Sequence, residues 1–235
     1  MAPLLFDLDG TIIDCRARHY TLYARIIGEQ GGTPLAGGEY WRRRRAGKST
    51  MDILSATPEV DVERFTWAWF GRIESPAALA LDAPFDGAVR ILESVRAEHQ
   101  VILVTLRRDR RALLHQLDSL RLTSLFEEII SCGPRPESRK ALLPGCSALA
   151  SGGYVIGDTE ADLELGSGTG RRTVCVSNGV RSGRFLAARG ARTVISSLRE
   201  LPEVITAAER SGGPGDVADV EHRVASRYLD TRAGL

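Results

Sequence analysis

Two aspartates spaced two residues apart near the start of the chain are the first residues with the chemistry of a catalytic site. They stand in Phe6-Asp7-Leu8-Asp9-Gly10-Thr11, after an apolar run. Residues two apart on an extended strand point the same way, so both carboxylates can reach one substrate. One can attack phosphorus to give an aspartyl-phosphate, while the other protonates the leaving oxygen and later activates water. A solvated Asp-Gly turn at a strand end would give the same residues, so the pair needs support from elsewhere.

A second acidic pair follows the apolar run Tyr154-Val-Ile, in Gly157-Asp158-Thr159-Glu160-Ala161-Asp162. Asp158 leaves the expected strand end, and Asp162 stands one helical turn later on a nearby face. Mg²⁺ prefers oxygen ligands and commonly takes one or two carboxylates together with substrate phosphate and water. Asp7 and Asp158 would supply those carboxylates. The alternative is an N-capping aspartate followed by an acidic residue in the first helical turn.

Two single residues complete the arrangement. Thr105 ends the run Val101-Ile-Leu-Val, where its hydroxyl and backbone N–H could bind a phosphoryl oxygen. Lys140 begins an expected helix, where its charge could offset that of phosphate and two carboxylates. Arg139 competes for this role. Either residue alone is as compatible with a structural or solvent-exposed position, so the prediction rests on the order of all four features.

The elements that must position these residues are short buried strands that alternate with helices. The strands are expected at 3–8, 101–105, 128–131, 154–158 and 173–177, and the helices include 88–97, 110–120 and 138–149. Such alternation implies right-handed crossovers and a mostly parallel sheet covered on both faces, with ligands at the carboxyl ends of the strands. The sequence therefore predicts an α/β, Rossmann-like core.

One section interrupts the alternation. From about Cys15 to about Leu81 the pattern is helical, and all three tryptophans of the chain fall there. Segments 18–27 and 60–73 each place aromatic and aliphatic residues on one face. We therefore expect an inserted all-helical domain at 15–81, a core domain formed by 1–14 and 82–210, and a flexible tail at 211–235 that begins with Ser-Gly-Gly-Pro-Gly.

The composition of the chain limits which classes of partner are expected. The 235 residues include 31 Lys+Arg against 30 Asp+Glu, so no overall charge favours nucleic acid or a membrane surface. No apolar run reaches the length of about 18 residues that a membrane span needs, and the first apolar stretch is too short for a signal peptide. The four cysteines lack disulfide or zinc spacing. A cytoplasmic protein, monomeric or homodimeric, is expected.

Taken together, these residues resemble the haloacid dehalogenase-like phosphohydrolase superfamily, in its helical-cap, phosphoglycolate phosphatase-like branch, from Pro3 to about Leu201. The resemblance implies Asp7 as nucleophile and Asp9 as general acid and base, with Asp9 also a metal ligand through its carbonyl. Thr105 matches the second motif and Lys140 the third. The fourth motif matches Asp158 and Asp162 as further Mg²⁺ ligands, with Asp158 the more direct one. The helical insertion would be a cap that closes over the cleft and selects the substrate.

The chain also departs from this family pattern. The interval from Lys140 to Asp158 is shorter than in many relatives, and Ala141 replaces a common proline. Leu106-Arg107 follows Thr105 where an asparagine is common. In the expected cap, 45–50 stands where relatives place a specificity loop. There Lys48 could meet a substrate anion or be solvated. The residues expected to contact the substrate are Gly10, Thr11, Lys48, Leu106 and Arg107.

The function that follows is a Mg²⁺-dependent phosphatase acting on a small phosphorylated metabolite. A dehalogenase would not need Asp9. A phosphonoacetaldehyde hydrolase-like enzyme would need a cap lysine, for which Lys48 is the candidate, and a sugar-phosphate mutase would share the same motifs. A non-catalytic module could bind nucleic acid or an acidic partner through Trp41 and Arg42-Arg43-Arg44-Arg45. The near-zero net charge favours a solvated or substrate-facing surface for these arginines.

Overall fold

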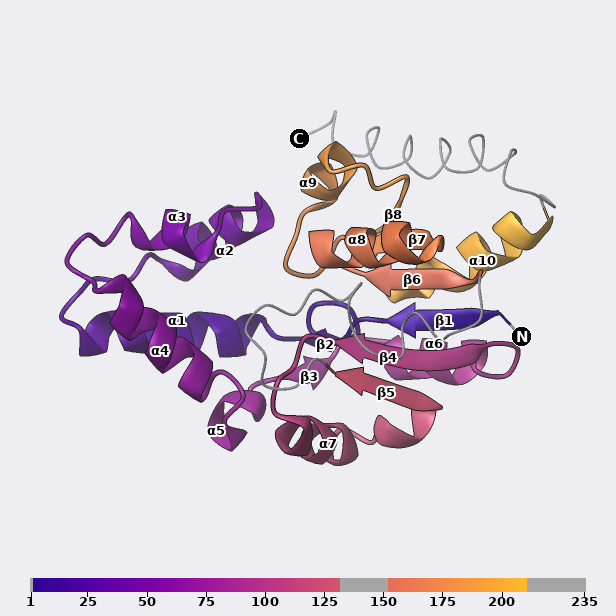
Figure 1. Cartoon of the computed structure of the whole chain (residues 1–235), viewed down its shortest axis with the longest axis horizontal. Helices are drawn as coiled ribbons and strands as arrows, with labels where there is room; N and C mark the ends of the chain where they lie inside the picture. Colours follow the sequence, from indigo (N-terminus) through magenta and orange to yellow (C-terminus); the bar gives the residue numbers. More distant parts are fainter. Residues whose placement is uncertain (1, 132–151, 211–235) are drawn as a thin grey trace.

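A six-stranded parallel sheet forms the centre of the protein in the computed structural model, which describes residues 2–131 and 152–210. Its strand order is β5-β4-β1-β6-β7-β8, so β1 lies between β4 and β6 (Figure 1). The strands are β1 (Pro3–Phe6), β4 (Gln100–Thr105), β5 (Glu128–Ser131), β6 (Tyr154–Gly157), β7 (Arg172–Val176) and β8 (Thr193–Ile195). All five neighbouring pairs are parallel.

Helices cover both faces of the sheet, and the side chains of β1 alternate between these faces. Leu4 and Phe6 are fully buried in the larger hydrophobic cluster, whereas Leu5, between them, belongs to a second cluster on the other face. The first cluster includes residues of α6 (Ala88–Val95), α7 (Arg110–Ser119) and α10 (Leu201–Arg210). The second includes Leu165 of α8 (Glu160–Thr169). The short helix α9 (Gly183–Ala188) and two 3₁₀ turns, Thr123–Leu125 and Leu198–Glu200, complete the core.

Five helices between the first strands form a separate packed group, seen beside the sheet in Figure 1. They are α1 (Arg16–Glu29), α2 (Gly37–Arg45), α3 (Thr50–Leu54), α4 (Val62–Arg72) and α5 (Pro76–Leu79). Their buried residues form a cluster of their own, which includes Tyr23, Ile27, Phe65 and Ile73. We call residues 16–79 the helical segment. All of its helices fall inside the predicted range 15–81.

Side-chain caps fix where three of these helices begin. The Ser49 hydroxyl accepts a hydrogen bond from the Asp52 backbone N–H, and the Asp52 carboxylate accepts one from the Ser49 backbone N–H, which forms a capping box at α3. Asp61 caps α4. Ser75 caps α5, whose first residue is Pro76, a position where the missing N–H of proline costs nothing.

The two chain crossings into the helical segment run side by side. β2 (Ile13–Asp14) and β3 (Ala83–Pro84) form a two-stranded antiparallel ladder, with Ile13 opposite Pro84 and Asp14 opposite Ala83. The helical segment is therefore joined to the sheet through a pair of adjacent, very short strands.

The predicted α/β fold with its parallel sheet is confirmed, and all five expected strands are present within one or two residues of their predicted ends. The sequence analysis missed β8, which has three residues at the sheet edge, and the two-residue strands β2 and β3. Runs this short carry no detectable period. The expected helix 138–149 and the tail 211–235 lie outside the described residues. Among the helices that the structure does describe, none has the length and apolar character of a membrane span.

Candidate catalytic site

The carboxyl ends of three neighbouring strands bring the expected catalytic residues to one edge of the sheet. Asp7 follows β1, Thr105 ends β4 and Asp158 follows β6. The Asp7 backbone N–H donates to the Ile156 carbonyl at 2.8 Å, so the ladder continues one residue beyond β1 and fixes the Asp7 backbone. This edge is where open α/β sheets bind their ligands.

Asp7, Asp158 and Asp162 bring their carboxylates together at this edge. Each offers an oxygen atom within 4.8 Å of the others. Asp7 is 7% exposed, and the other two are fully buried. Three buried negative charges this close repel one another, and a bound divalent cation would relieve the repulsion. The donor set consists only of hard oxygen atoms, which fits Mg²⁺. We call these three residues the acidic trio.

The loop around Asp158 is built to hold its carboxylate. The Thr11 hydroxyl donates to Asp158 Oδ1 at 3.2 Å, and the Val180 backbone N–H donates to Oδ2 at 2.5 Å. Gly10 has a φ of +90°, and a Cβ atom there would lie 2.3 Å from Asp158 Oδ2. A Cβ atom at Gly179 would lie equally close to the same oxygen. Only glycine fits at these two positions. Gly10 and Thr11, expected on the substrate, therefore lie against Asp158.

Asp162 serves the start of α8 as well as the acidic trio. Its Oδ2 atom accepts hydrogen bonds from the Thr159 backbone N–H at 3.0 Å and from the Thr159 hydroxyl at 2.8 Å. The N-cap of α8 is thus Thr159 rather than the aspartate that the sequence left open as the alternative, and Asp162 is its capping-box partner in the first helical turn. The two roles coexist because the cap holds Asp162 in a fixed orientation beside Asp158.

The Asp9 side chain is bound by two arginines. Its Oδ1 atom is paired with Arg18 of α1, and its Oδ2 atom accepts from Arg107 Nε at 2.5 Å. Burial disfavours the charged form, but the charges of Arg107 and Arg18 outweigh it and hold the pKa of Asp9 well below its usual range. Asp9 is therefore a carboxylate in this arrangement.

Asp82, in the second chain crossing, completes this group of charges. Its buried side chain lies 3.1 Å from Arg18 Nε and 3.5 Å from Arg107, and it accepts a hydrogen bond from Gln116 at 2.8 Å. Burial raises the pKa of Asp82 to about 6. The positive charge of Arg18 opposes this rise, and the negative charge of Asp9 adds to it. We call Asp9, Arg18, Asp82 and Arg107 the Asp9 network.

The remaining expected residues are placed as follows. Arg107 is 4% exposed and contacts Asp9, Asp82 and Gln116, which makes it part of the Asp9 network. Thr105 is buried at the end of β4, and Leu106 beside it is exposed. Lys48 is exposed in the turn between α2 and α3. Lys140 and its competitor Arg139 lie outside the described residues. Sequence analysis missed Arg18 and Asp82 because neither stands in a recognisable motif.

The end of α2 contacts the loop that holds Asp158. The Arg45 guanidinium donates to the carbonyls of Gly179 at 2.7 Å and Ser177 at 2.8 Å. In return, Arg181 donates to the Arg44 carbonyl at 2.8 Å and pairs with Glu160 of α8. Figure 1 shows α2 reaching toward α9 at this place. The helical segment is therefore fastened to the core next to the acidic trio.

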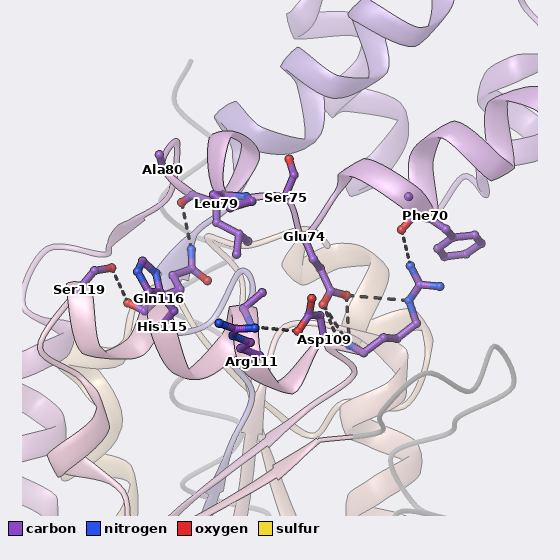
Figure 2. A pocket seen from close by; sticks show the side chains of 14 residues that line it. Phe70, Glu74, Ser75, Leu79, Ala80, Asp109, Arg111, His115, Gln116 and Ser119 are labelled. Carbon is purple, nitrogen blue, oxygen red and sulfur yellow. Dashed lines mark hydrogen bonds and ion pairs between the residues drawn. The ribbon is translucent and has the colours of Figure 1, made fainter.

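A cavity lies between α4, α5 and α7, with a volume of about 710 Å³ (Figure 2). Glu74 ties the helical segment to the start of α7 by accepting hydrogen bonds from the backbone N–H groups of Arg108 and Asp109. Gln116 in the cavity wall donates to the Leu79 carbonyl at 3.1 Å and to Asp82. The cavity is lined by none of the acidic trio, but it reaches the Asp9 network through Gln116.

The chain belongs to the haloacid dehalogenase-like hydrolase family, whose sequence model matches residues 4–176. The family predicted from the motifs, and with it the assignment as an enzyme, is therefore confirmed.

Two curated relatives are named phosphoglycolate phosphatase. The plasmid-encoded protein of Cupriavidus necator is 26% identical over 221 residues, which cover 87% of this chain and 93% of the relative. That of Pseudomonas syringae is 24% identical, with coverage of 84% and 77%. Among solved structures, a predicted phosphatase from Clostridium acetobutylicum matches with a TM-score of 0.69 at 18% identity, over 88% of this chain and 99% of its own. A haloacid dehalogenase-like hydrolase from Streptococcus pneumoniae matches with a TM-score of 0.64 at 17% identity, over 87% of this chain and 98% of its own. At these identities the structures show the shared fold.

The raised pKa of Asp82 gives a test of the Asp9 network. A folded-state pKa of about 6, above the ordinary 3.8, means that the folded chain holds this proton more tightly than the unfolded chain. The resulting stability is present below about pH 4 and is lost as the pH rises through about 6. We therefore expect the free energy of unfolding of the wild type, minus that of Asp82→Asn, to fall by roughly 2 kcal/mol over this range. Urea unfolding from pH 4 to 7 measures it.

The exposed substitution Glu98→Gln serves as the control for that experiment, since it should leave the pH dependence of the wild type intact. Parallel stability curves for wild type and Asp82→Asn would show that Asp82 does not titrate in this window.

The acidic trio predicts stabilisation by Mg²⁺. A ligand that binds only the folded state adds RT ln(1 + [L]/Kd), about 2.7 kcal/mol at one hundred times Kd. We expect Mg²⁺ to raise the thermal midpoint of the wild type, and to raise that of Asp158→Asn much less because one buried ligand is lost. The readout is the shift on adding Mg²⁺ rather than the starting midpoint. Glu98→Gln should keep the full shift, and an equal shift in Asp158→Asn would rule out this site.

Proposed function

We propose that the chain is a Mg²⁺-dependent phosphatase that hydrolyses a small phosphorylated metabolite through an aspartyl-phosphate on Asp7. The observation that carries the proposal is the position of the Asp7 carboxylate beside Asp158 and Asp162, at the carboxyl edge of a parallel sheet in a chain of this hydrolase family. The close approach of three buried carboxylates is costly for stability alone, and a cation site explains it.

In this mechanism Asp7 attacks the phosphorus of the substrate and forms a new P–O bond, while the bond from phosphorus to the ester oxygen breaks. Asp9 gives a proton to the departing oxygen, so the product leaves as an alcohol. Asp9 then takes a proton from water, whose oxygen attacks the aspartyl-phosphate and releases inorganic phosphate and free Asp7. Bound Mg²⁺ would supply positive charge for the phosphoryl oxygens.

The contacts of Asp9 constrain its protonation in this cycle. Asp9 is held as a carboxylate by Arg18 and Arg107, which suits its action as a base. To act as an acid it must carry a proton, and both guanidinium groups oppose that. Asp9 therefore has to leave at least one of them before it protonates the leaving oxygen. We propose that Arg18 is the partner that separates from Asp9, because it belongs to α1 of the helical segment, whereas Arg107 follows a central strand.

We further propose that the helical segment is a cap over the site and selects the substrate, with Thr105 binding the phosphoryl group and Lys140 or Arg139 supplying the cation. The short ladder of β2 and β3 supports the cap assignment because it joins the helical segment to the sheet at one place. A site under such a cap excludes water from the acyl-phosphate during the first step.

The curated relatives make phosphoglycolate the first substrate to test. Release of inorganic phosphate distinguishes a phosphatase from a mutase, which would return the phosphoryl group to another hydroxyl. The alternative of a nucleic-acid-binding module is less favoured because Arg42 and Arg43 pair with Glu39, and Arg45 binds core carbonyls.

The nucleophile is tested by Asp7→Asn. We expect this change to lower Mg²⁺-dependent phosphate release from phosphoglycolate and from an aryl phosphate by at least about a thousandfold, since an amide cannot form the acyl-phosphate. Stopped-time phosphate assays with a folding check by circular dichroism measure it. Glu98→Gln should retain wild-type rates, and normal activity of Asp7→Asn would refute the mechanism.

The acid role of Asp9 predicts a dependence on the leaving group. An alkoxide needs a proton in order to depart, whereas an aryl oxide departs readily without one. We therefore expect Asp9→Asn to slow the phosphorylation step by roughly 10²- to 10⁴-fold with an alkyl phosphate and by much less with 4-nitrophenyl phosphate. Single-turnover kinetics on both substrates measure this step directly. An equal loss on the two would leave Asp9 without an acid role.

A further inference from the structure

The loop of residues 177–182, between β7 and α9, contacts the acidic trio on one side and the helical segment on the other. Toward the trio, the Val180 backbone N–H donates to Asp158 Oδ2 at 2.5 Å. Toward the helical segment, the Gly179 carbonyl accepts from the Arg45 guanidinium group at 2.7 Å. We call this segment the Asp158 loop. It lies between the end of α2 and a carboxylate of the candidate metal site.

The two contacts are made by a single peptide unit. The Gly179 carbonyl and the Val180 N–H flank one C–N bond, and this unit is trans, so it is planar with its oxygen and hydrogen on opposite sides. A guanidinium group that fixes the carbonyl therefore also fixes the direction of the N–H. Arg45 donates a second hydrogen bond to the Ser177 carbonyl at 2.8 Å, so the loop is held at two points. Hydrogen bonds in series also polarise one another, which strengthens the one that Asp158 accepts.

The end of α2 is held against the core by packing as well as by the Arg45 side chain. Gly47 has a φ of +81° and lies so close to the Phe185 ring of α9 that a Cβ atom there would be 1.9 Å from a ring carbon. The Arg45 carbonyl accepts a hydrogen bond from the Ser182 N–H at 3.0 Å. The position of Arg45 beside the Asp158 loop is therefore set by the fit of the α2 end against α9.

We infer that Arg45 is a positioning residue of the metal site. From the helical segment it orients the peptide unit that holds Asp158, and it thereby raises the affinity of the acidic trio for Mg²⁺. Groups that orient a metal ligand from outside commonly change metal affinity by about 10- to 100-fold when they are replaced. By thermodynamic linkage, Mg²⁺ at the trio in turn favours the contact between α2 and the loop. This inference rests on the metal site of the proposed function and deepens it.

The charge of Arg45 alone predicts the opposite effect. A guanidinium group near the trio repels a divalent cation, so its removal would tighten Mg²⁺ binding if charge were the main effect. Loss of the oriented Val180 N–H weakens binding instead. Arg45 is half-buried, so solvent screens its charge, whereas the direction of a hydrogen bond is not screened. The two explanations differ in the sign of the change, and substitution of Arg45 distinguishes them.

Isothermal titration calorimetry with MgCl₂ measures the affinity without any substrate. We expect Arg45→Gln to raise the Kd for Mg²⁺ by about tenfold, because Arg45 acts on the ligand through one peptide unit. Arg45→Lys keeps the charge and loses the planar fork, so it should also raise the Kd, and it carries the test if Arg45→Gln does not fold. Asp158→Asn should abolish the binding heat, which identifies the site that is titrated.

Arg42→Gln is the matched control, because Arg42 stands on the same helix, is exposed and pairs with Glu39. It should leave the Kd unchanged. Gly47→Ala displaces the end of α2 without removing Arg45, since the added Cβ atom collides with Phe185, and it should raise the Kd. Because both changes act through one contact, the double variant should bind Mg²⁺ about as weakly as Arg45→Gln alone.

A second readout follows the linkage from the metal to the helical segment. All three tryptophans of the chain belong to that segment, and Trp41 stands one turn before Arg45 on α2. We expect Mg²⁺ to change the tryptophan emission of the wild type, with the midpoint found by calorimetry. Arg45→Gln should lose most of this change even at saturating Mg²⁺. Trp41→Phe should remove the signal and keep the Kd, which assigns the signal to α2.

Two outcomes would overturn the inference. An unchanged Kd in both Arg45→Gln and Arg45→Lys would limit the contact with the Asp158 loop to packing. A lower Kd in Arg45→Gln would show that Arg45 acts through its charge. A wild type that binds Mg²⁺ but releases no phosphate would instead count against the proposed function.

Discussion

The repulsion among three buried carboxylates at the carboxyl edge of the sheet is the constraint to which the surrounding structure responds. Asp7, Asp158 and Asp162 approach within 4.8 Å because a parallel ladder, a helix cap and a tight turn each fix one of them. Gly10 and Gly179 lack the Cβ atoms that would collide with Asp158. A fold that stabilised only itself would separate these charges. Holding them together creates a site whose electrostatic cost a divalent cation removes.

A second group of buried charges, the Asp9 network, lies in the same region and compensates its own charge. In the Asp9 network, Arg18 and Arg107 balance Asp9 and Asp82, so burial leaves no net charge. Its members come from α1, from the residues after β4 and from the second chain crossing. The network therefore joins the catalytic loop to both chain connections of the helical segment. Any movement of α1 relative to the sheet changes the partners of Asp9, which couples the position of the helices to the acid and base.

The sequence was sufficient for five of the six strands of the sheet, because each central strand is a continuous apolar run that stops at a polar residue. Asp7 and Asp158 follow directly from that pattern. The Asp9 network could not be predicted in this way, because a buried ion pair leaves no local period and Asp82 stands in no recognisable motif. Arg107 was named for the substrate because the motif around Thr105 suggested it, whereas its burial and its partner Asp9 come from packing across the sheet edge. Lys140 stays a prediction.

The arginines of α2 show most clearly where sequence reasoning stops. Four identical neighbours read as one basic cluster, yet successive residues on a helix are turned by about 100° from one another, so they cannot share one environment. Glu39 forms ion pairs with Arg42 and Arg43, which stand three and four residues after it. Arg45 donates hydrogen bonds to backbone carbonyls of the loop after β7. Within residues 2–131 and 152–210, Arg44 alone of the four has no side-chain hydrogen bond or ion pair, and its Nε atom is buried. The contacts of the Arg45 side chain and of the Arg44 carbonyl thus join the helical segment to the loop beside Asp158.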